Sequence, residues 1–164
     1  MRTFAFLWNP ETKTPDRLMA WDEFDADRRT VQKLGMVRRH WTCTRGDMRA
    51  GDRFFLSKGG DTNKGLIGSG WVLAPRGHGR CWLQFTGLVA FDKGIRREDV
   101  LGLSPEANDF FGSLRASGQE IPASVAELVE KTWAYVVRVE PALAQFEQAP
   151  LPAEPPKNTI VVRR

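Results

Sequence analysis

Two short apolar runs joined by a glycine-rich turn constrain the fold of this chain more than any other feature. The runs cover residues 54–56 and 66–72, and the turn is Gly-Gly-Asp at residues 59–61. Runs of this length with Gly and Asp between them predict a β-hairpin. Gly68 and Gly70 interrupt the second run, and a glycine inside a strand marks a bulge or the close approach of a ligand or another backbone. The hairpin is therefore expected to carry part of a binding surface.

The rest of the chain predicts a mixture of strands and helices. Aromatic and β-branched runs predict further strands over residues 3–8, 36–44 and 81–91. Apolar residues at helical spacing predict a helix over residues 17–34, with Asp16 as its N-cap and Gly35 as its end. A second helix is expected through residues 121–133, whereas residues 104–119 show no clear pattern. The class is α+β, with a small, strongly bent sheet or barrel and helices at its ends.

The domain organisation follows from length and from the distribution of proline. A chain of 164 residues is long enough to bury a core as one domain, which we expect over residues 1–147. Residues 148–164 begin with a stretch that carries four prolines, and such a composition is typical of a linker or an extended arm.

Positive charge is concentrated in one part of the sequence. The chain has a net charge of +4, but residues 28–58 alone carry nine basic and two acidic side chains, a surplus of seven. A local surplus of this kind is the electrostatic footprint of a nucleic-acid-binding protein. A solvated basic face would give the same composition, so the charge alone does not decide between the two.

Cysteine usage and the apolar runs indicate a cytoplasmic protein that does not bind membranes. Cys43 and Cys81 are the two cysteines, too few for a disulfide framework, and the N-terminal residues lack the form of a signal peptide. No apolar run is long enough for a membrane span.

The residue types of the common catalytic and metal sites are present without the required pattern. His40/Cys43 and His78/Cys81 repeat a spacing that zinc sites use, but on strands this spacing directs the two side chains to opposite faces. There is no nucleophile elbow, phosphate loop or dinucleotide fingerprint. We therefore expect neither a metal nor a cofactor, and we expect the chain not to be an enzyme.

Three tryptophans are the strongest candidates for ligand contacts. Each follows a strand or neighbours turn residues, and basic side chains lie close to them in sequence. A flat ring with a basic rim suits a stacked nucleobase and its phosphate. The tryptophans are Trp8, Trp41 and Trp71, and the nearby cations are Arg45, Arg49 and Lys58.

Several segments, in this order, resemble the EVE domain, in particular the EVE-like modules that precede HNH nucleases in modification-dependent restriction systems. The segments are Phe-Leu-Trp-Asn-Pro (6–10), Trp-Thr-Cys-Thr-Arg-Gly (41–46), Arg-Ala-Gly-Asp-Arg-Phe-Phe-Leu (49–56), Gly-Leu-Ile-Gly-Ser-Gly-Trp-Val (65–72) and Ser-Gly-Gln-Glu-Ile-Pro (117–122). The hairpin segments are shared with the wider PUA-like group. Their combination with the Trp-Asn-Pro and Ser-Gly-x-x-Ile-Pro segments is more specific.

The resemblance implies a PUA-like curved β-barrel with peripheral helices that reads a modified base in DNA. A flipped 5-methylcytosine or hydroxymethylated cytosine would lie in an aromatic cage, without catalysis. The implied pocket consists of Trp8, Asn9, Trp41, Ser57, Lys58, Ser69, Gly70, Trp71, Ser117 and Gly118. Arg45 and Arg49 would lie at its mouth, and the expected phosphate contacts are Arg38, Arg39, Arg45 and Arg49.

The sequence leaves two other functions open. No HNH-like cluster of His and Asn follows the resembling segments, so a nuclease effector would be another domain or a partner. An RNA-binding PUA-like module, or an accessory domain of an RNA-modifying enzyme, fits the rings and the basic stretch as well. A small-molecule-binding or hydrolytic ASCH-like protein would need a pocketed acid or base, and the sequence offers no clear candidate.

Overall fold

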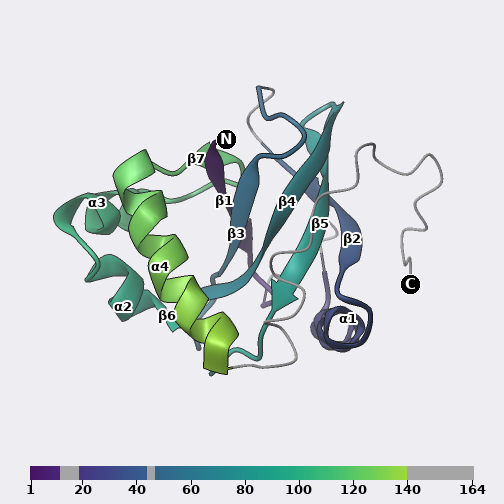
Figure 1. The fold of residues 1–164 in the computed structure, drawn as a ribbon, viewed down its shortest axis with the longest axis horizontal. Coiled ribbons are helices and arrows are strands. Elements are labelled where there is room, and N and C mark those ends of the chain that lie inside the picture. The colour runs from purple at the N-terminus through teal and green to yellow at the C-terminus, as the bar shows by residue number, and fades with distance from the viewer. Residues whose placement is uncertain (12–18, 44–46, 140–164) are drawn as a thin grey trace.

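The computed structural model describes residues 1–11, 19–43 and 47–139. Within these ranges the protein is α+β, with a mixed sheet of seven strands and four helices (Figure 1). The strands are β1 (Thr3–Trp8), β2 (Val37–Thr42), β3 (Arg53–Lys58), β4 (Gly65–Gly77), β5 (Arg80–Leu88), β6 (Ile95–Arg96) and β7 (Gln119–Glu120). The helices are α1 (Trp21–Leu34), α2 (Arg97–Leu101), α3 (Pro105–Ser113) and α4 (Ala123–Val139).

The sheet has the strand order β2-β5-β4-β3-β1-β7, and β6 pairs with β4. The predicted hairpin is β3 and β4, which pair antiparallel. The pairing of β1 with β3 is parallel and runs from Thr3↔Arg53 to Trp8↔Lys58. Because parallel strands end at the same edge of a sheet, the segments after Trp8 and after Lys58 leave the sheet side by side.

The sheet bends far enough for two strands that are not neighbours to touch. Three strands separate β2 from β1 in the sheet order, yet Trp41 Nε1 of β2 donates a hydrogen bond of 3.2 Å to Leu7 O of β1. Among the described residues the pairings still leave β2 and β7 at two open ends, so the sheet is not closed into a barrel.

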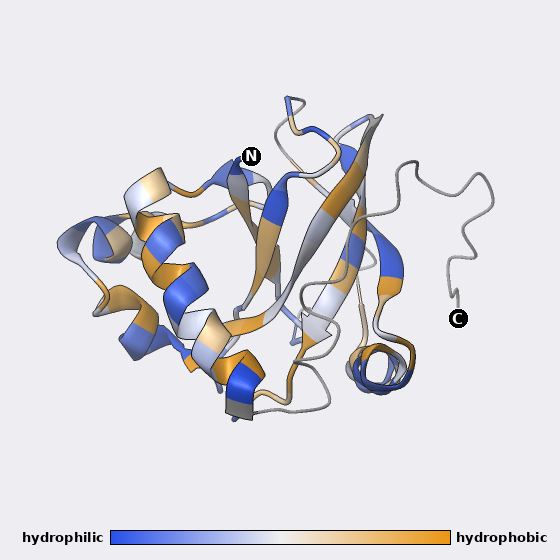
Figure 2. Cartoon of the chain, viewed as in Figure 1, coloured by the Kyte–Doolittle hydropathy of each residue, from blue (hydrophilic) through white to orange (hydrophobic). Residues whose placement is uncertain are grey.

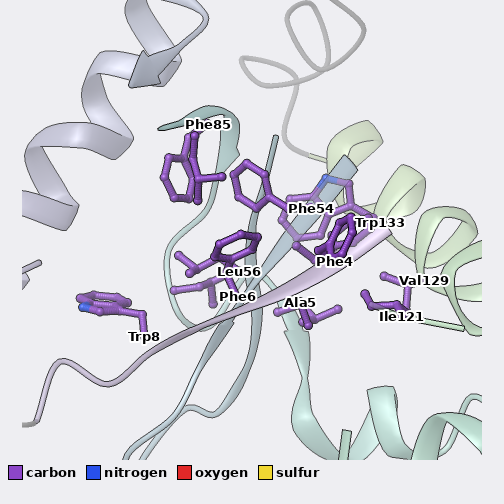
Figure 3. Packing of buried hydrophobic residues seen from close by; sticks show 14 of the residues in the cluster. Phe4, Ala5, Phe6, Trp8, Phe54, Leu56, Phe85, Ile121, Val129 and Trp133 are labelled. Carbon is purple, nitrogen blue, oxygen red and sulfur yellow. The ribbon is translucent and has the colours of Figure 1, made fainter. Parts of the chain in front are cut away.

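A continuous aromatic core fills the space between the sheet and the helices. Phe6, Phe54 and Phe85 meet edge to face, with ring centroids 5.4 Å and 4.9 Å apart (Figure 3). On the other face Phe55 packs against Trp133 of α4 at 5.9 Å. Hydrophobic and hydrophilic residues alternate along α4 (Figure 2), as in a helix that covers a core with one face. Helix α1 lies on the opposite side of the sheet from α2, α3 and α4 (Figure 1).

Gly70, in the middle of β4, allows the neighbouring strand to approach closely. A Cβ atom on Gly70 would lie 1.9 Å from Gln84 O of β5 and 2.8 Å from the Phe54 ring. The pairing of β4 with β5 also shifts register between Ser69 and Gly70, which is the bulge that the sequence predicts. The close approach is therefore made by a neighbouring strand and leaves no room for a ligand.

Two helices differ from the sequence prediction. Helix α1 begins at Trp21, where the Glu23 carboxylate accepts a 2.7 Å hydrogen bond from Ala20 N, while the predicted cap Asp16 lies outside the described residues. Residues 104–119, which have no clear pattern, contain α3. Its N-cap is Ser104, whose Oγ accepts a 3.0 Å hydrogen bond from Ala107 N, and Pro105 follows.

A buried ion pair fastens α1 to β2. Arg39, an expected phosphate contact, is 6% exposed, and its guanidinium donates to both carboxylate oxygens of Asp27, with 3.0 Å from Nη2 to Oδ1. Glu23 lies 3.8 Å from the same guanidinium. The expectation for Arg39 is therefore wrong, because its position on the inner face of β2 turns its charge toward α1.

Replacing Asp27 with alanine should lower the free energy of unfolding by about 3–5 kcal/mol, because the Arg39 charge would stay buried without its main partner. Urea unfolding monitored by circular dichroism measures this change. Asp25→Ala on the same helix is the matched control, since Asp25 pairs with Arg28 on the surface at 3.4 Å. This variant should lower the free energy of unfolding by about 0.5 kcal/mol or less. Equal unfolding midpoints for the two variants would contradict the role assigned to Asp27.

Candidate functional site

A cavity of about 360 Å³ opens at the carboxyl ends of β1 and β3. Its volume falls in the range of small-ligand sites, roughly 300–1,000 Å³. Strand ends supply one wall, and α2, α3 and the segment after α3 supply the others. The lining residues are Leu7, Trp8, Asn9, Ser57, Lys58, Gly59, Gly60, Lys64, Arg97, Phe111, Leu114 and Arg115.

The parallel pairing of β1 with β3 places the two polar segments of this wall together. The pairing continues beyond Lys58, since Gly59 N donates a 2.8 Å hydrogen bond to Trp8 O. The chain then turns at Gly60, whose φ of +89° is in the left-handed region that favours glycine. The Glu11 carboxylate holds the turn by accepting a 2.7 Å hydrogen bond from Asp61 N.

Two side chains in the wall have hydrogen-bonding groups to offer a ligand. Asn9 is exposed, and its Oδ1 accepts a 3.0 Å hydrogen bond from Glu11 N, which fixes the side chain at the end of β1. The Asn9 amide nitrogen remains as a double donor. Ser57 is half-buried and contributes a hydroxyl that donates and accepts.

Lys58 is a clamp for the loop that follows β3. Its side chain is buried, and Nζ donates hydrogen bonds to Gly59 O at 3.1 Å and to Thr62 O at 2.5 Å. Nζ also lies 5.1 Å from the Phe91 ring centroid and 4.0 Å from the Glu11 carboxylate. Burial lowers the pKa of Lys58, and the Glu11 carboxylate opposes this shift. The ammonium group thus holds the loop that forms part of the cavity wall.

Three further cations line the cavity. They are Lys64, Arg97 and Arg115, and none of them forms an ion pair with a carboxylate among the described residues. Arg115 Nη1 donates to the carbonyl oxygens of Gly112 and Leu114 at 3.0 Å and 2.9 Å. A concave site lined by one sign of charge concentrates counter-ions, so the cavity attracts anions.

The structure does not bring the three candidate tryptophans together. Trp8 lines the cavity, but its indole is 2% exposed, stacks on Phe24 at 4.9 Å and donates from Nε1 to Met19 O at 2.9 Å. Trp41 is fully buried against Phe85 and lines no part of the cavity. The expectation of three indoles around one hollow is therefore wrong, because Trp41 has a structural role in the bend of the sheet.

Trp71 lies on the other face of the sheet from Trp41. The Arg53 guanidinium lies 4.9 Å from the Trp71 ring, and Arg53 Nε pairs with Glu130 of α4 at 2.8 Å. Ser69 and Gly70 are buried within β4. These three residues take no part in the cavity, because they lie in the middle of β4, whereas the cavity is reached only at the start of that strand, beside Lys64.

Ser117 and Gly118 hold β1 in place behind the cavity. Ser117 Oγ accepts a 2.9 Å hydrogen bond from Leu7 N and lies 3.3 Å from Leu7 O, to which it donates. Gly118 N donates a 2.8 Å hydrogen bond to Ala5 O. The two residues position the cavity wall, and neither lines the cavity as a pocket rim would.

The expected phosphate contacts that the structure describes do not line the cavity. Arg38 donates from Nε to Gln84 Oε1 at 3.1 Å on the outer face of β2, and burial lowers its pKa. Arg49 precedes β3 and so lies at the opposite end of that strand from the cavity, about 20 Å away for a strand of six residues. Arg45 lies outside the described residues.

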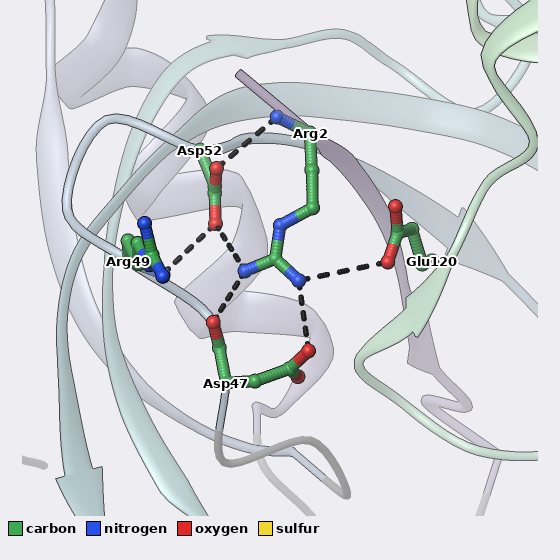
Figure 4. Close-up of polar contacts among 5 residues, drawn as sticks. All are labelled: Arg2, Asp47, Arg49, Asp52 and Glu120. Carbon is green, nitrogen blue, oxygen red and sulfur yellow. Dashed lines mark hydrogen bonds and ion pairs between the residues drawn. The ribbon is translucent and has the colours of Figure 1, made fainter.

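The loop that carries Arg49 is fixed by a network around Arg2 (Figure 4). The Asp52 carboxylate accepts hydrogen bonds from the backbone nitrogens of Arg49 and Arg2, at 2.8 Å and 3.1 Å. The Arg2 guanidinium reaches Asp47 at 2.8 Å and Glu120 at 3.6 Å. Acidic side chains surround Arg2, so this end of the sheet carries less uncompensated positive charge than its sequence suggests.

The two cysteines are also buried, Cys43 directly after β2 and Cys81 on the neighbouring strand β5. Cys81 Sγ lies 3.6 Å from Trp41 O, and burial raises the pKa of the Cys81 thiol. His40 packs on Trp82 with ring centroids 3.5 Å apart. In the part of the chain that the structure describes, no three His, Cys, Asp or Glu side chains gather as a metal site requires.

No protein-family model, curated protein or solved structure matched this chain in the comparisons. Within the described ranges, the helices are all too short or too polar to cross a bilayer.

The cavity contains residues that the sequence did not single out. Lys64, Arg97, Phe111, Leu114 and Arg115 all line it. Leu114 and Arg115 are separated only by Ala116 from Ser117-Gly118, a segment of the EVE resemblance, and this proximity was a usable signal. Nothing local in the sequence separates Arg97 from other surface arginines.

Replacing Ser117 with alanine should lower the free energy of unfolding by about 1–3 kcal/mol, because Leu7 N would lose its hydrogen-bond acceptor. Thermal and urea unfolding measure the change. Ser113→Ala is the control, since the Ser113 hydroxyl is exposed and bonds only to carbonyls of its own helix. It should change the stability by about 0.5 kcal/mol or less. A Ser117 variant as stable as the Ser113 variant would show that the hydrogen bonds between Ser117 and Leu7 do not stabilise β1.

Proposed function

We propose that the protein is a PUA-like reader of modified cytosine in DNA that holds the extruded base in the cavity at the ends of β1 and β3. One observation carries this proposal. The cavity unites Trp8 and Asn9 with Ser57 and Lys58, although the two pairs are 50 residues apart at Trp8↔Lys58. Both pairs fall in or directly beside segments that resemble the EVE domain, which supports the same function.

The cavity offers walls on which a flat base can rest. Phe111 and Leu114 form its apolar side, and Trp8 also lines it, although only 2% of this residue is exposed. Extruding a base from a duplex costs a few kcal/mol, and stacking on aromatic rings returns about 1–3 kcal/mol per base. With two largely buried rings, stacking offsets only part of the extrusion cost.

Hydrogen bonds and charge supply the remaining affinity. In the proposed complex the Asn9 amide and the Ser57 hydroxyl bond to the polar edge of the base. Lys64, Arg97 and Arg115 attract the DNA backbone, so the affinity falls as salt rises. A methyl group buried against the apolar wall adds about 0.8 kcal/mol, roughly fourfold in affinity. A hydroxymethyl group that gains a hydrogen bond would be recognised more strongly.

Binding alone is the proposed activity. In the part of the chain that the structure describes, the lining residues include no carboxylate or histidine that could act as a general base, and Lys58 Nζ is already bonded to two carbonyl oxygens. A nuclease effector on another domain or partner would carry out any cleavage that follows recognition.

The protein should bind a duplex with one 5-hydroxymethylcytosine more tightly than the same duplex with cytosine. Asn9→Ala should reduce this ratio of affinities about two- to tenfold. Fluorescence anisotropy with labelled duplexes at fixed salt measures both. Thr42→Ala is the control, since Thr42 is exposed at the end of β2 and does not line the cavity. It should bind like the wild type.

Equal affinity of the wild type for all duplexes would remove the reader function. Tighter binding to single-stranded RNA than to any modified duplex would instead favour the RNA-binding PUA-like module.

A further inference from the structure

The cavity carries more positive charge than recognition of a neutral base needs. Among the described residues, Lys64, Arg97 and Arg115 line it without ion-pair partners, and no carboxylate lines it. A second hollow of about 440 Å³ shares Lys64 and Arg97 but has acidic side chains in its wall, namely Asp61, Asp92 and Glu98. The two neighbouring hollows therefore differ in the charge that they present.

Several arginines elsewhere in the described structure pair with carboxylates. Arg39 pairs with Asp27, Arg53 pairs with Glu130, and Arg96 pairs with Asp99 at 2.9 Å. Arg97 and Arg115 have no such partner among the described residues, and both line the same concave site. Like charges held close together repel one another, so an anion that enters between them is favoured.

The residue types in this cluster indicate which anion fits. A guanidinium presents its N–H donors as a planar fork that matches the two oxygens of a carboxylate or phosphate. Arg115 uses Nη1 for two carbonyl oxygens of its own segment, which restrains its side chain against the cavity wall. Lys64 adds a point charge at the same opening.

We propose that the nucleotide bound in this cavity presents an oxyanion to Lys64, Arg97 and Arg115. The oxyanion is either a carboxylate on the base or the phosphate of the same nucleotide, and it is bound within the cavity. This inference rests on the proposed function for its assumption that the ligand is a nucleotide, and it adds the class of nucleotide that binds most tightly.

The test uses small probes that separate the two sources of the oxyanion. Isothermal titration calorimetry at constant ionic strength compares 2′-deoxycytidine, its 5-formyl and 5-carboxy derivatives, and deoxycytidine monophosphate. The formyl nucleoside is the matched neutral probe, because it resembles the carboxy nucleoside in size. At least one anionic probe should bind about tenfold or more tightly than the formyl nucleoside. A gain for the carboxy nucleoside alone assigns the oxyanion to the base, and a gain for the monophosphate alone assigns it to the phosphate.

Charge-removing variants tie the effect to the cavity. Arg97→Gln and Arg115→Gln should each reduce the gain of the anionic probe about tenfold and leave the neutral probes unchanged. Arg29→Gln on α1 removes the same charge from an exposed site outside the cavity lining and should leave all probes unchanged. Equal effects of the three variants would overturn the inference.

The inference and the proposed function can fail separately. It is overturned if the anionic probes bind no more tightly than the formyl nucleoside, or if no probe binds, while a preference for modified duplexes would leave the reader function standing. Tight binding of an anionic probe without any duplex preference would keep the oxyanion site and remove the reader function.

Discussion

The parallel pairing of β1 with β3 is the constraint on which the rest of the structure depends. It sets Trp8 beside Lys58 and continues through the hydrogen bond from Gly59 to Trp8. Because both strands end at one edge, two turns leave the sheet together and form the back of a hollow. Ser117 then fastens Leu7 from the far side and positions the end of β1. The cavity is thus a consequence of strand direction, closed by helices that the sheet positions.

Two of the tryptophans that were candidates for ligand contacts have structural roles. Trp41 is buried and uses its indole N–H to join β2 to β1 across the bend, and Trp8 anchors the segment before α1 by donating to Met19. Both are large rings with a polar handle, which suits them to core positions where one hydrogen bond can be satisfied. In the proposed complex, recognition depends instead on smaller polar groups at the strand ends and on cations from distant segments.

Much of the secondary structure could be predicted from local pattern. The strand predicted over residues 36–44 is confirmed as β2 at Val37–Thr42, with Val37, Arg39 and Trp41 buried on one face. Helix α3 was missed because it has only two buried residues, Ala107 and Phe111, and its one strong signal is the Ser104-Pro105 start. Which face of a strand meets the ligand depends on the bend of the whole sheet. Local pattern therefore could not exclude Trp41 or Trp71 from the site, nor bring Arg97 to it.

The proposed function requires that a nucleotide binds at the carboxyl ends of β1 and β3. Nuclear magnetic resonance spectra of the ¹⁵N-labelled protein, recorded while an oligonucleotide with one modified cytosine is added, test this claim most directly. The backbone amide signals of Asn9, Gly59 and Gly60 should shift first and most. Shifts confined to Arg49 and Trp71, at the opposite end and face of the sheet, would contradict the account.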